Sequence, residues 1–130
     1  MTYSFAVEMK PTYLHAKGSG EQTEANARQF LIDAYLACIK HNMSRLLLET
    51  CFTGKPLSVG GAYSVIVDRS HDGSMLKSIA YVDNNPAHAH QMAEFAELVA
   101  KNRGVNVRLF DNVAAAERWL KDEATADAQT

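Results

Sequence analysis

The order of apolar and polar positions along the chain predicts alternating strands and helices. Residues 3–9 (YSFAVEM) and 13–17 (YLHAK) alternate as half-buried strands do, and the Lys-Pro-Thr turn at 10–12 separates them. We therefore expect a β-hairpin at the start of the chain. From about residue 21 to residue 42, apolar side chains recur every three or four positions, which predicts a helix with one buried face.

The middle of the chain continues the alternation. Residues 45–50 (RLLLET) form a short apolar run, which is typical of a strand covered on both faces of a sheet. Ser58 is expected to cap a second helix that ends near residue 70, because a serine side chain can accept from the free N–H groups of a helix start. Residues 76–83 (LKSIAYVD) then predict another strand.

The last third of the chain repeats the helix and strand pattern. Asn85 followed by proline is a favourable helix start, and Gly104 stands where the cap at a helix C-terminus belongs. Residues 105–110 (VNVRLF) predict a strand, and the Asp-Asn pair that follows is expected to cap a last helix. The polar residues 123–130 are expected to fray as a tail.

The resulting order, ββαβαβαβα, indicates an α/β fold. Helices that connect successive strands imply parallel pairing through right-handed crossovers. We therefore expect a mixed, mostly parallel five-stranded sheet whose first strand is antiparallel, with about four helices. A chain of 130 residues supports one hydrophobic core, so residues 1–122 are expected to form a single domain.

Composition excludes several classes of protein. The chain has 13 Lys and Arg against 15 Asp and Glu, a net charge of -2, which does not favour a nucleic-acid partner. No apolar run approaches the roughly 20 residues of a membrane span, and the first residues lack the basic-then-apolar pattern of a signal peptide, so we expect a cytoplasmic protein without an integral membrane segment. Cys38 and Cys51 lack the spacing of a redox or zinc motif, and no disulfide is expected.

This succession of elements resembles the STAS domain, the fold of anti-sigma-factor antagonists and of the cytoplasmic tails of sulfate transporters. The resemblance covers roughly residues 13–120. It rests on the element order, on the Gly-x-Gly-Glu turn at 18–21, on the Ser-Val-Gly-Gly helix start at 58–61, and on the closing pattern V-x-V-x-x-F-x-x-x-x-x-A-x-x-W-L at 105–120. The chain is most like the stand-alone members of that superfamily, whose roles are mostly uncharacterised.

The resemblance implies a role for Ser58. In the signalling members, an Asp-Ser-Ser-Gly-like turn at the start of the second helix carries a serine that a partner kinase phosphorylates. By position Ser58 matches that serine and Gly60 matches the glycine, whereas Leu57 replaces the acidic residue and Val59 replaces the second hydroxyl. The resemblance therefore implies phosphorylation of Ser58 in a turn that lacks the acidic residue.

Two loops are candidates for a ligand site. The free N–H groups of a helix start at Ser58 could hold an anion or phosphate, although an ordinary cap explains the serine as well. Asp83 ends a parallel strand at the same edge of the sheet, where ligands of α/β folds bind, although caps and turns also use such residues. The predicted ligand-binding residues are Lys55, Ser58, Gly60, Gly61, Asp83, Asn84 and Asn85.

No catalytic or metal-binding residue is assigned. A Ser-His-Asp triad cannot be read from spacing, and His88 and His90 are two apart on a predicted helix, so they cannot share a metal ion. We expect a non-catalytic regulatory or binding module without a cofactor, which recognises a protein partner or a small anionic or lipid-like ligand. The alternative is a small hydrolase or transferase that uses Ser58 or a histidine at the strand ends. A homodimer through the exposed edge of the first hairpin is a third alternative.

Overall fold

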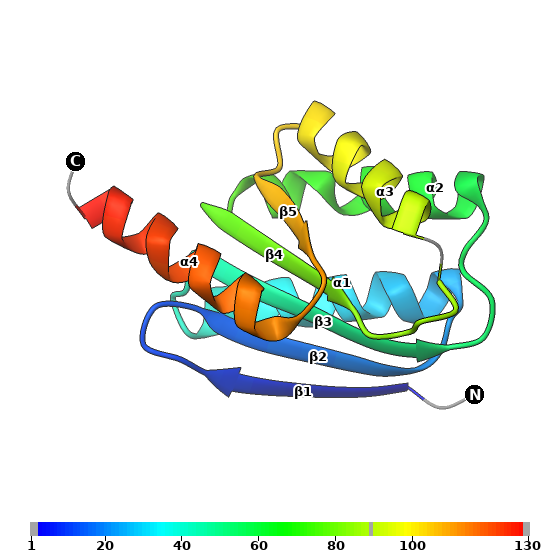
Figure 1. Ribbon diagram of the computed structural model, residues 1–130, viewed down its shortest axis with the longest axis horizontal. Coiled ribbons are helices and arrows are strands. Elements are labelled where there is room, and N and C mark those ends of the chain that lie inside the picture. The colour runs from blue at the N-terminus through cyan, green and yellow to red at the C-terminus, as the bar shows by residue number, and fades with distance from the viewer. Residues whose placement is uncertain (1–2, 89, 129–130) are drawn as a thin grey trace.

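The computed structural model describes residues 3–88 and 90–128, and their elements follow the predicted order (Figure 1). They are β1 (Tyr3–Met9), β2 (Leu14–Glu21), α1 (Glu24–Lys40), β3 (Arg45–Thr53), α2 (Val59–Ser74), β4 (Ser78–Asp83), α3 (His90–Asn102), β5 (Val107–Phe110) and α4 (Val113–Ala128).

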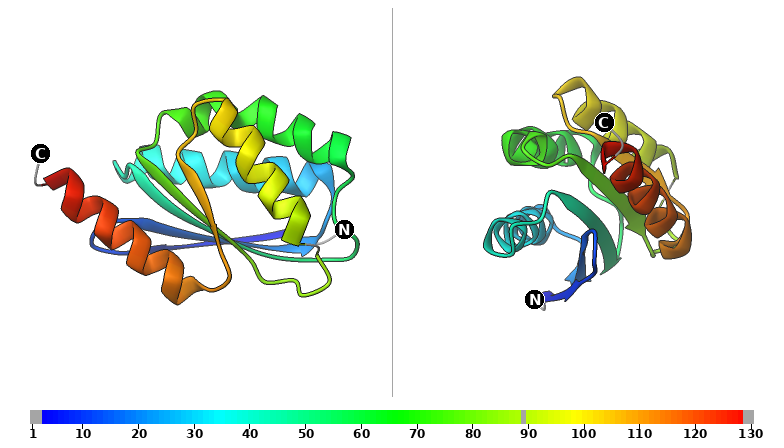
Figure 2. Two further views of the ribbon diagram at one scale, coloured as in Figure 1. Left: turned by 45° about the horizontal axis from the view of Figure 1, so that its top comes forward. Right: turned by 90° about the vertical axis from the view of Figure 1, so that its left-hand side faces the viewer.

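The strands form one five-stranded sheet in the order β1-β2-β3-β4-β5. β1 pairs antiparallel with β2, and every later pair is parallel. Because the parallel strands are added in one direction with crossovers of one hand, the connecting helices α1, α2 and α3 lie on one face and α4 lies on the other (Figures 1 and 2). The predicted fold, a mixed and mostly parallel sheet with four helices, is confirmed.

Each face of the sheet carries a hydrophobic core. On the side of α1 to α3, Leu46 and Leu48 of β3 are buried in a cluster that includes Phe30 of α1. On the side of α4, Leu47 is buried with Leu120. Successive side chains of a strand point to opposite faces, so a central strand covered on both sides reads as an unbroken apolar run. This is why RLLLET predicts β3.

Several element boundaries differ from the predicted ones. β2 continues through the glycines at 18 and 20 to Glu21, and α2 extends to Ser74 instead of ending near residue 70. The predicted start of α3 at Asn85 is wrong, because α3 begins at His90. Asn85 belongs to a turn, in which its side chain donates to the carbonyl oxygen of Phe52 and accepts from the backbone N–H of Ala87.

The end of the chain is also more ordered than its composition suggests. α4 is helical through Ala128, so the prediction of a frayed tail from residue 123 is wrong for residues 123–128. The physical reason is a tertiary contact: Oδ2 of Asp127 accepts hydrogen bonds from Arg45 Nη2 at 2.7 Å and from Lys77 Nζ at 2.8 Å. Arg45 is the first residue of β3 and Lys77 directly precedes β4, so the last turn of α4 is held to the sheet.

Candidate functional site

The loops that follow β3 and β4 lie side by side at the carboxyl edge of the sheet. Asn85 Nδ2 donates to the carbonyl oxygen of Phe52 at 2.9 Å, and Nε2 of His88 lies 3.1 Å from the carbonyl oxygen of Gly54. Phe52 and Gly54 precede α2, whereas Asn85 and His88 precede α3. The two loops therefore form one continuous rim.

Asp83 organises the second of these loops. Its Oδ1 accepts from the backbone N–H of Asn85 at 3.0 Å, and its Oδ2 lies 2.7 Å from Nδ1 of His88. The His88 side chain is 7% exposed, so these contacts hold an almost fully buried imidazole in one orientation. Asp83, Asn85 and His88 are thus brought together, whereas the side chain of His90 lies outside the described residues.

The Ser58 turn is a helix cap whose electrostatic environment includes an acidic side chain. Ser58 is exposed, and its Oγ accepts from the backbone N–H of Gly61 at 3.0 Å. The carboxylate of Glu24, from the first turn of α1, lies beside the same helix start: a Cβ added at Gly61 would lie 2.9 Å from Oε2 of Glu24. The positive end of the α2 dipole therefore already faces a carboxylate.

The remaining residues of the predicted set diverge from this turn. Lys55 is exposed in the loop before α2, and a Cβ added at Gly60 would meet no atom within 4 Å, so this glycine borders open space. Asn84 points to the face of the sheet opposite the cavity described below, where its Nδ2 donates to Glu49 and to Sγ of Cys51. The structure thus separates Asn84 from Asp83 and Asn85.

Asn84 instead belongs to a polar cluster on the α4 side of the sheet. Oε1 of Glu49 lies 2.7 Å from Nε2 of His15, and Oε2 accepts from Asn84. Burial by itself raises the pKa of the Glu49 carboxyl, but the hydrogen bonds from Asn84 and His15 outweigh it and the pKa is lowered. This cluster ties the middle strands together on the face that α4 leaves partly open.

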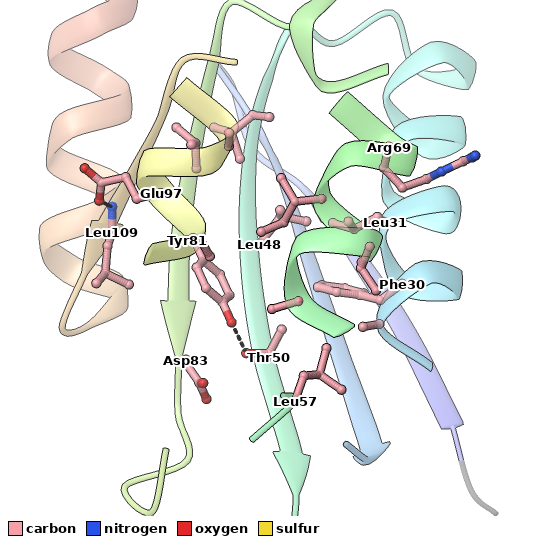
Figure 3. Close-up of a pocket in the computed structure, with 18 of the residues that line it drawn as sticks. Phe30, Leu31, Leu48, Thr50, Leu57, Arg69, Tyr81, Asp83, Glu97 and Leu109 are labelled. Atoms are coloured by element: carbon pink, nitrogen blue, oxygen red, sulfur yellow. Dashed lines mark hydrogen bonds between the residues drawn. The ribbon is translucent and has the colours of Figure 1, made fainter. Parts of the chain in front are cut away.

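A cavity of about 190 Å³ lies beneath α2 and α3, between these helices and the sheet (Figure 3). Most of its wall is apolar. Strands contribute Leu48, Ile79, Val107 and Leu109, and helices contribute Phe30, Leu31, Ala62, Val65, Ile66, Ala96 and Ala100. Pro56, Leu57, Asp83 and His88 also line the cavity, so it reaches the rim formed by the two loops.

Two neutral hydroxyl groups face this cavity. Thr50 Oγ1 donates to the hydroxyl oxygen of Tyr81 across a long distance of 3.5 Å (Figure 3). Burial raises the pKa of Tyr81 to about 12, with a smaller contribution from the Asp83 carboxylate, so the phenol stays protonated at neutral pH. Thr50 and Tyr81 therefore offer weakly bonded donors and acceptors inside an apolar wall.

Glu97 and Arg69, two charged residues of the cavity wall, each have a partner of opposite charge. Oε2 of Glu97 accepts from the backbone N–H of Leu109 at 2.9 Å, and its Oε1 accepts from Lys101 Nζ at 2.8 Å. Arg69 is directed away from the cavity (Figure 3), and its Nη1 lies 3.5 Å from Oδ2 of Asp72. The interior of the cavity is thus neutral, and the Asp83 carboxylate lies at its rim.

Sequence reasoning missed Thr50, Tyr81 and the cavity itself. The available signal was two hydroxyl residues at positions of β3 and β4 whose alternation places them on the helix side of the sheet. The space between helices depends on how α2 and α3 pack, which no local pattern encodes.

The geometry of a nucleophilic triad is not formed at this edge. In the range 3–88 together with 90–128, no hydrogen bond joins Ser58 to a histidine; the Ser58 Oγ accepts from the backbone N–H of Gly61. His88 has a carboxylate partner in Asp83, but its second nitrogen lies 3.1 Å from both Gly54 O and Asn85 Nδ2. Among the described residues, no three His, Cys, Asp or Glu side chains group as a metal ion requires.

Comparisons with known proteins bear on the fold. No protein-family model and no curated protein sequence matches this chain. Among solved structures, the chain is similar to an uncharacterised protein of the DUF3478 family from Shewanella loihica PV-4, described as having a SpoIIAA-like fold; the TM-score is 0.55 at 18% identity, over 91% of this chain and 93% of that one. None of the helices within the described ranges has the length and apolar character that crossing a membrane requires. The chain thus has the SpoIIAA-like, STAS fold that its sequence predicts.

Proposed function

We propose that the chain is a non-catalytic binding module for a small, mostly apolar ligand that carries an uncharged hydrogen-bonding end. The observation that carries the proposal is the cavity of about 190 Å³, whose apolar wall is interrupted by the hydroxyls of Thr50 and Tyr81. Apolar pockets with a few convergent polar groups are the usual form of a small-molecule site.

Size and charge narrow the ligand class. A protein cavity of about 150 Å³ is enough to hold benzene, so a cavity of about 190 Å³ suits a single ring or a short chain. An anionic end is less suitable than a neutral one, because Asp83 places a carboxylate at the rim and the guanidinium of Arg69 is directed elsewhere. A hydroxyl or carbonyl can instead bond to Tyr81 or Thr50.

Two further parts of the proposal concern how the module acts. At the rim, Asn85 contacts Phe52 at the end of β3 and His88 contacts Gly54 in the loop that leads into α2, so movement of this rim would widen access to the cavity. A protein partner that recognises this rim would distinguish the occupied from the empty state, which is the regulatory role we propose.

Self-association is included in the proposal because β1, an edge strand, is mostly exposed.

The ligand proposal is tested with benzyl alcohol and benzoate, which share a ring and differ in the charge of the polar end. We expect benzyl alcohol to raise the unfolding midpoint by a few degrees, since about 1 kcal/mol of binding free energy moves the midpoint by roughly 3–6 °C in a domain of this size. Benzoate should raise it less. Isothermal titration calorimetry then gives the two affinities.

Matched variants locate the binding. Ala62→Trp places an indole at the cavity wall and should abolish the response to benzyl alcohol, whereas Ala114→Trp on the exposed face of α4 should leave it unchanged. Binding that survives in the Ala62→Trp variant, or no binding of either compound at millimolar concentration, would rule out the cavity as the ligand site.

A further inference from the structure

The two edges of the sheet are protected to different degrees. β5, at one edge, has four residues and is packed by both α3 and α4. Its outward backbone N–H at Leu109 is bonded by Oε2 of Glu97 at 2.9 Å. A capped, short strand between two helices cannot easily receive another strand. This edge is therefore the less suitable of the two for an additional strand.

β1, at the other edge, lacks such protection. It has seven residues, and five of them, including Ala6 to Met9, are exposed. Val7 and Met9 are 36% and 42% exposed, so this strand presents two large apolar side chains to solvent. No proline or bulge interrupts its pairing with β2. Natural proteins usually protect an edge of this kind.

The hydrogen-bond pattern shows which backbone groups of β1 are unpaired. The backbone N–H of Lys10 donates to the carbonyl oxygen of Tyr13 at 3.0 Å. Since bonded and non-bonded pairs alternate along an antiparallel ladder, the even-numbered residues of β1 bond to β2. The N–H and C=O groups of Phe5, Val7 and Met9 consequently point away from the sheet.

We infer that β1 pairs antiparallel with β1 of a second copy of this chain, around a two-fold axis at Ala6. This inference rests on the self-association part of the proposed function and is independent of the ligand. Ala6 is the centre of the strand Tyr3–Met9, so this register pairs all of its residues. Two sheets would join into one continuous sheet across the axis.

The side chains of β1 are self-complementary in this register. Phe5 lies opposite Val7 of the second copy, and Tyr3 lies opposite Met9, which gives aromatic and aliphatic cross-strand pairs. Phe5 and Val7 carry outward backbone groups, so they exchange both hydrogen bonds. Ala6 faces Ala6 in a non-bonded pair, where Cα atoms are about 4.5 Å apart and a small side chain fits.

Charge favours the same register. Glu8 lies opposite Ser4 of the second copy, and its carboxylate is already paired with Lys10 Nζ at 3.1 Å in its own chain. A register centred at Glu8 would place two carboxylates directly opposite each other, which is destabilising. A second copy can therefore pair with β1 without placing like charges of the two strands opposite each other, and this self-complementarity is the reason that we infer the chain itself as the partner.

A cysteine at the axis tests the register directly. In a Cys51→Ser background, which removes the half-exposed native thiol, Ala6→Cys should form an intermolecular disulfide under mild oxidation, because Cα atoms of a non-bonded pair lie within disulfide range. Ser4→Cys is the matched control: its two copies would be about 13 Å apart along the strands, beyond that range. Non-reducing electrophoresis should show a dimer band for the first variant and a weak one or none for the second.

Sedimentation equilibrium supplies the second measurement. The unmodified chain should be dimeric at micromolar concentration, and Ala6→Lys should weaken the dimer at least tenfold because it places two ammonium groups at the axis. Thr12→Lys, in the exposed hairpin turn, adds the same charge and should not. A dimer that resists Ala6→Lys and gives no Ala6→Cys cross-link overturns this pairing while leaving self-association by another surface. A chain that is monomeric at all concentrations overturns both, and the benzyl alcohol titration decides the ligand proposal separately.

Discussion

The imidazole of His88 joins the two loops at the rim of the cavity: its Nδ1 lies 2.7 Å from Oδ2 of Asp83, and its Nε2 lies 3.1 Å from the carbonyl oxygen of Gly54. Asp83 ends β4, whereas Gly54 follows β3. One nearly buried side chain therefore connects the ends of two parallel strands and fixes the rim of the proposed site.

Replacement of His88 should loosen this rim. His88→Ala leaves Oδ2 of Asp83 without its histidine partner, and we expect the free energy of unfolding to fall by about 1–3 kcal/mol, the usual cost of leaving a polar group unsatisfied. Urea denaturation measures this. His71→Ala is the control, because His71 is exposed on α2 and its loss should change stability by less than about 0.5 kcal/mol. Equal effects of the two variants would contradict a connecting role for His88.

The features that local sequence predicts are the ones that local physics determines. The side chain of Ser58 and the residues around it predict a helix cap, and the bond to Gly61 N–H confirms it. The apolar run of β3 and the alternation of helices and strands likewise determine the order of the sheet. These predictions need no knowledge of distant contacts.

Predictions fail, or are not made at all, where a feature depends on contacts between residues far apart in the sequence. Asp127 is polar and terminal, which predicts fraying, yet its contacts with Arg45 and Lys77 hold α4 to the sheet. The proximity of Glu24 to Gly61 arises where the first turns of α1 and α2 meet, far apart in sequence. The cavity is the extreme case, since it is the space that packed helices leave and no residue pattern specifies it.

Gly18, the first glycine of the Gly-x-Gly-Glu segment, has a packing role that can be tested. A Cβ at Gly18 would lie 2.6 Å from Cδ1 of Phe30, inside the ring contact that holds α1 to β2. Gly18→Ala should therefore cost about 1–3 kcal/mol of unfolding free energy through overpacking. Gly60→Ala is the matched control, since Gly60 borders open space in the first turn of α2, and it should stabilise the protein by up to about 1 kcal/mol. Thermal unfolding of both variants should give shifts of opposite sign.

A negative charge at position 58 should be repelled by the carboxylate of Glu24, which lowers the stability of the fold. Ser58 Oγ lies 3.1 Å, and Oε2 of Glu24 2.9 Å, from the position of a Cβ at Gly61, so the two side chains approach the same point. Ser58→Asn preserves the cap without adding charge and should leave the unfolding free energy nearly unchanged. Ser58→Asp also preserves the cap, but it brings a second carboxylate beside that of Glu24.

A double-mutant cycle isolates this repulsion. The change in unfolding free energy caused by Ser58→Asp should be more favourable by about 0.5 kcal/mol in a Glu24→Gln background than in the unmodified chain. This is the scale of a like-charge pair on a helix surface. Equal effects in both backgrounds would show that a phosphate on Ser58 is not opposed by Glu24.

Glu97 should make the stability of the fold depend on pH. Burial by itself raises the pKa of its carboxyl, but the hydrogen bonds from Lys101 and from the backbone of Leu109 outweigh it, and the pKa in the folded state is lowered. The unfolded chain therefore binds more protons than the folded one on the acidic side of neutrality. The stabilisation by Glu97 is present above its ordinary pKa and is lost as pH falls through the lowered value.

Glu97→Gln removes this dependence and locates it. The difference in unfolding free energy between the unmodified chain and the variant should be largest at neutral pH and should shrink as the solution is acidified, because protonation turns Glu97 into a neutral side chain much like glutamine. Asp122→Asn, which removes an exposed carboxylate of α4, is the charge-matched control and should give a small, nearly constant difference. Urea titrations between pH 3 and pH 7 measure both curves, and a Glu97→Gln difference that stays constant across this range would show that the bonds to Lys101 and Leu109 do not favour the charged carboxylate.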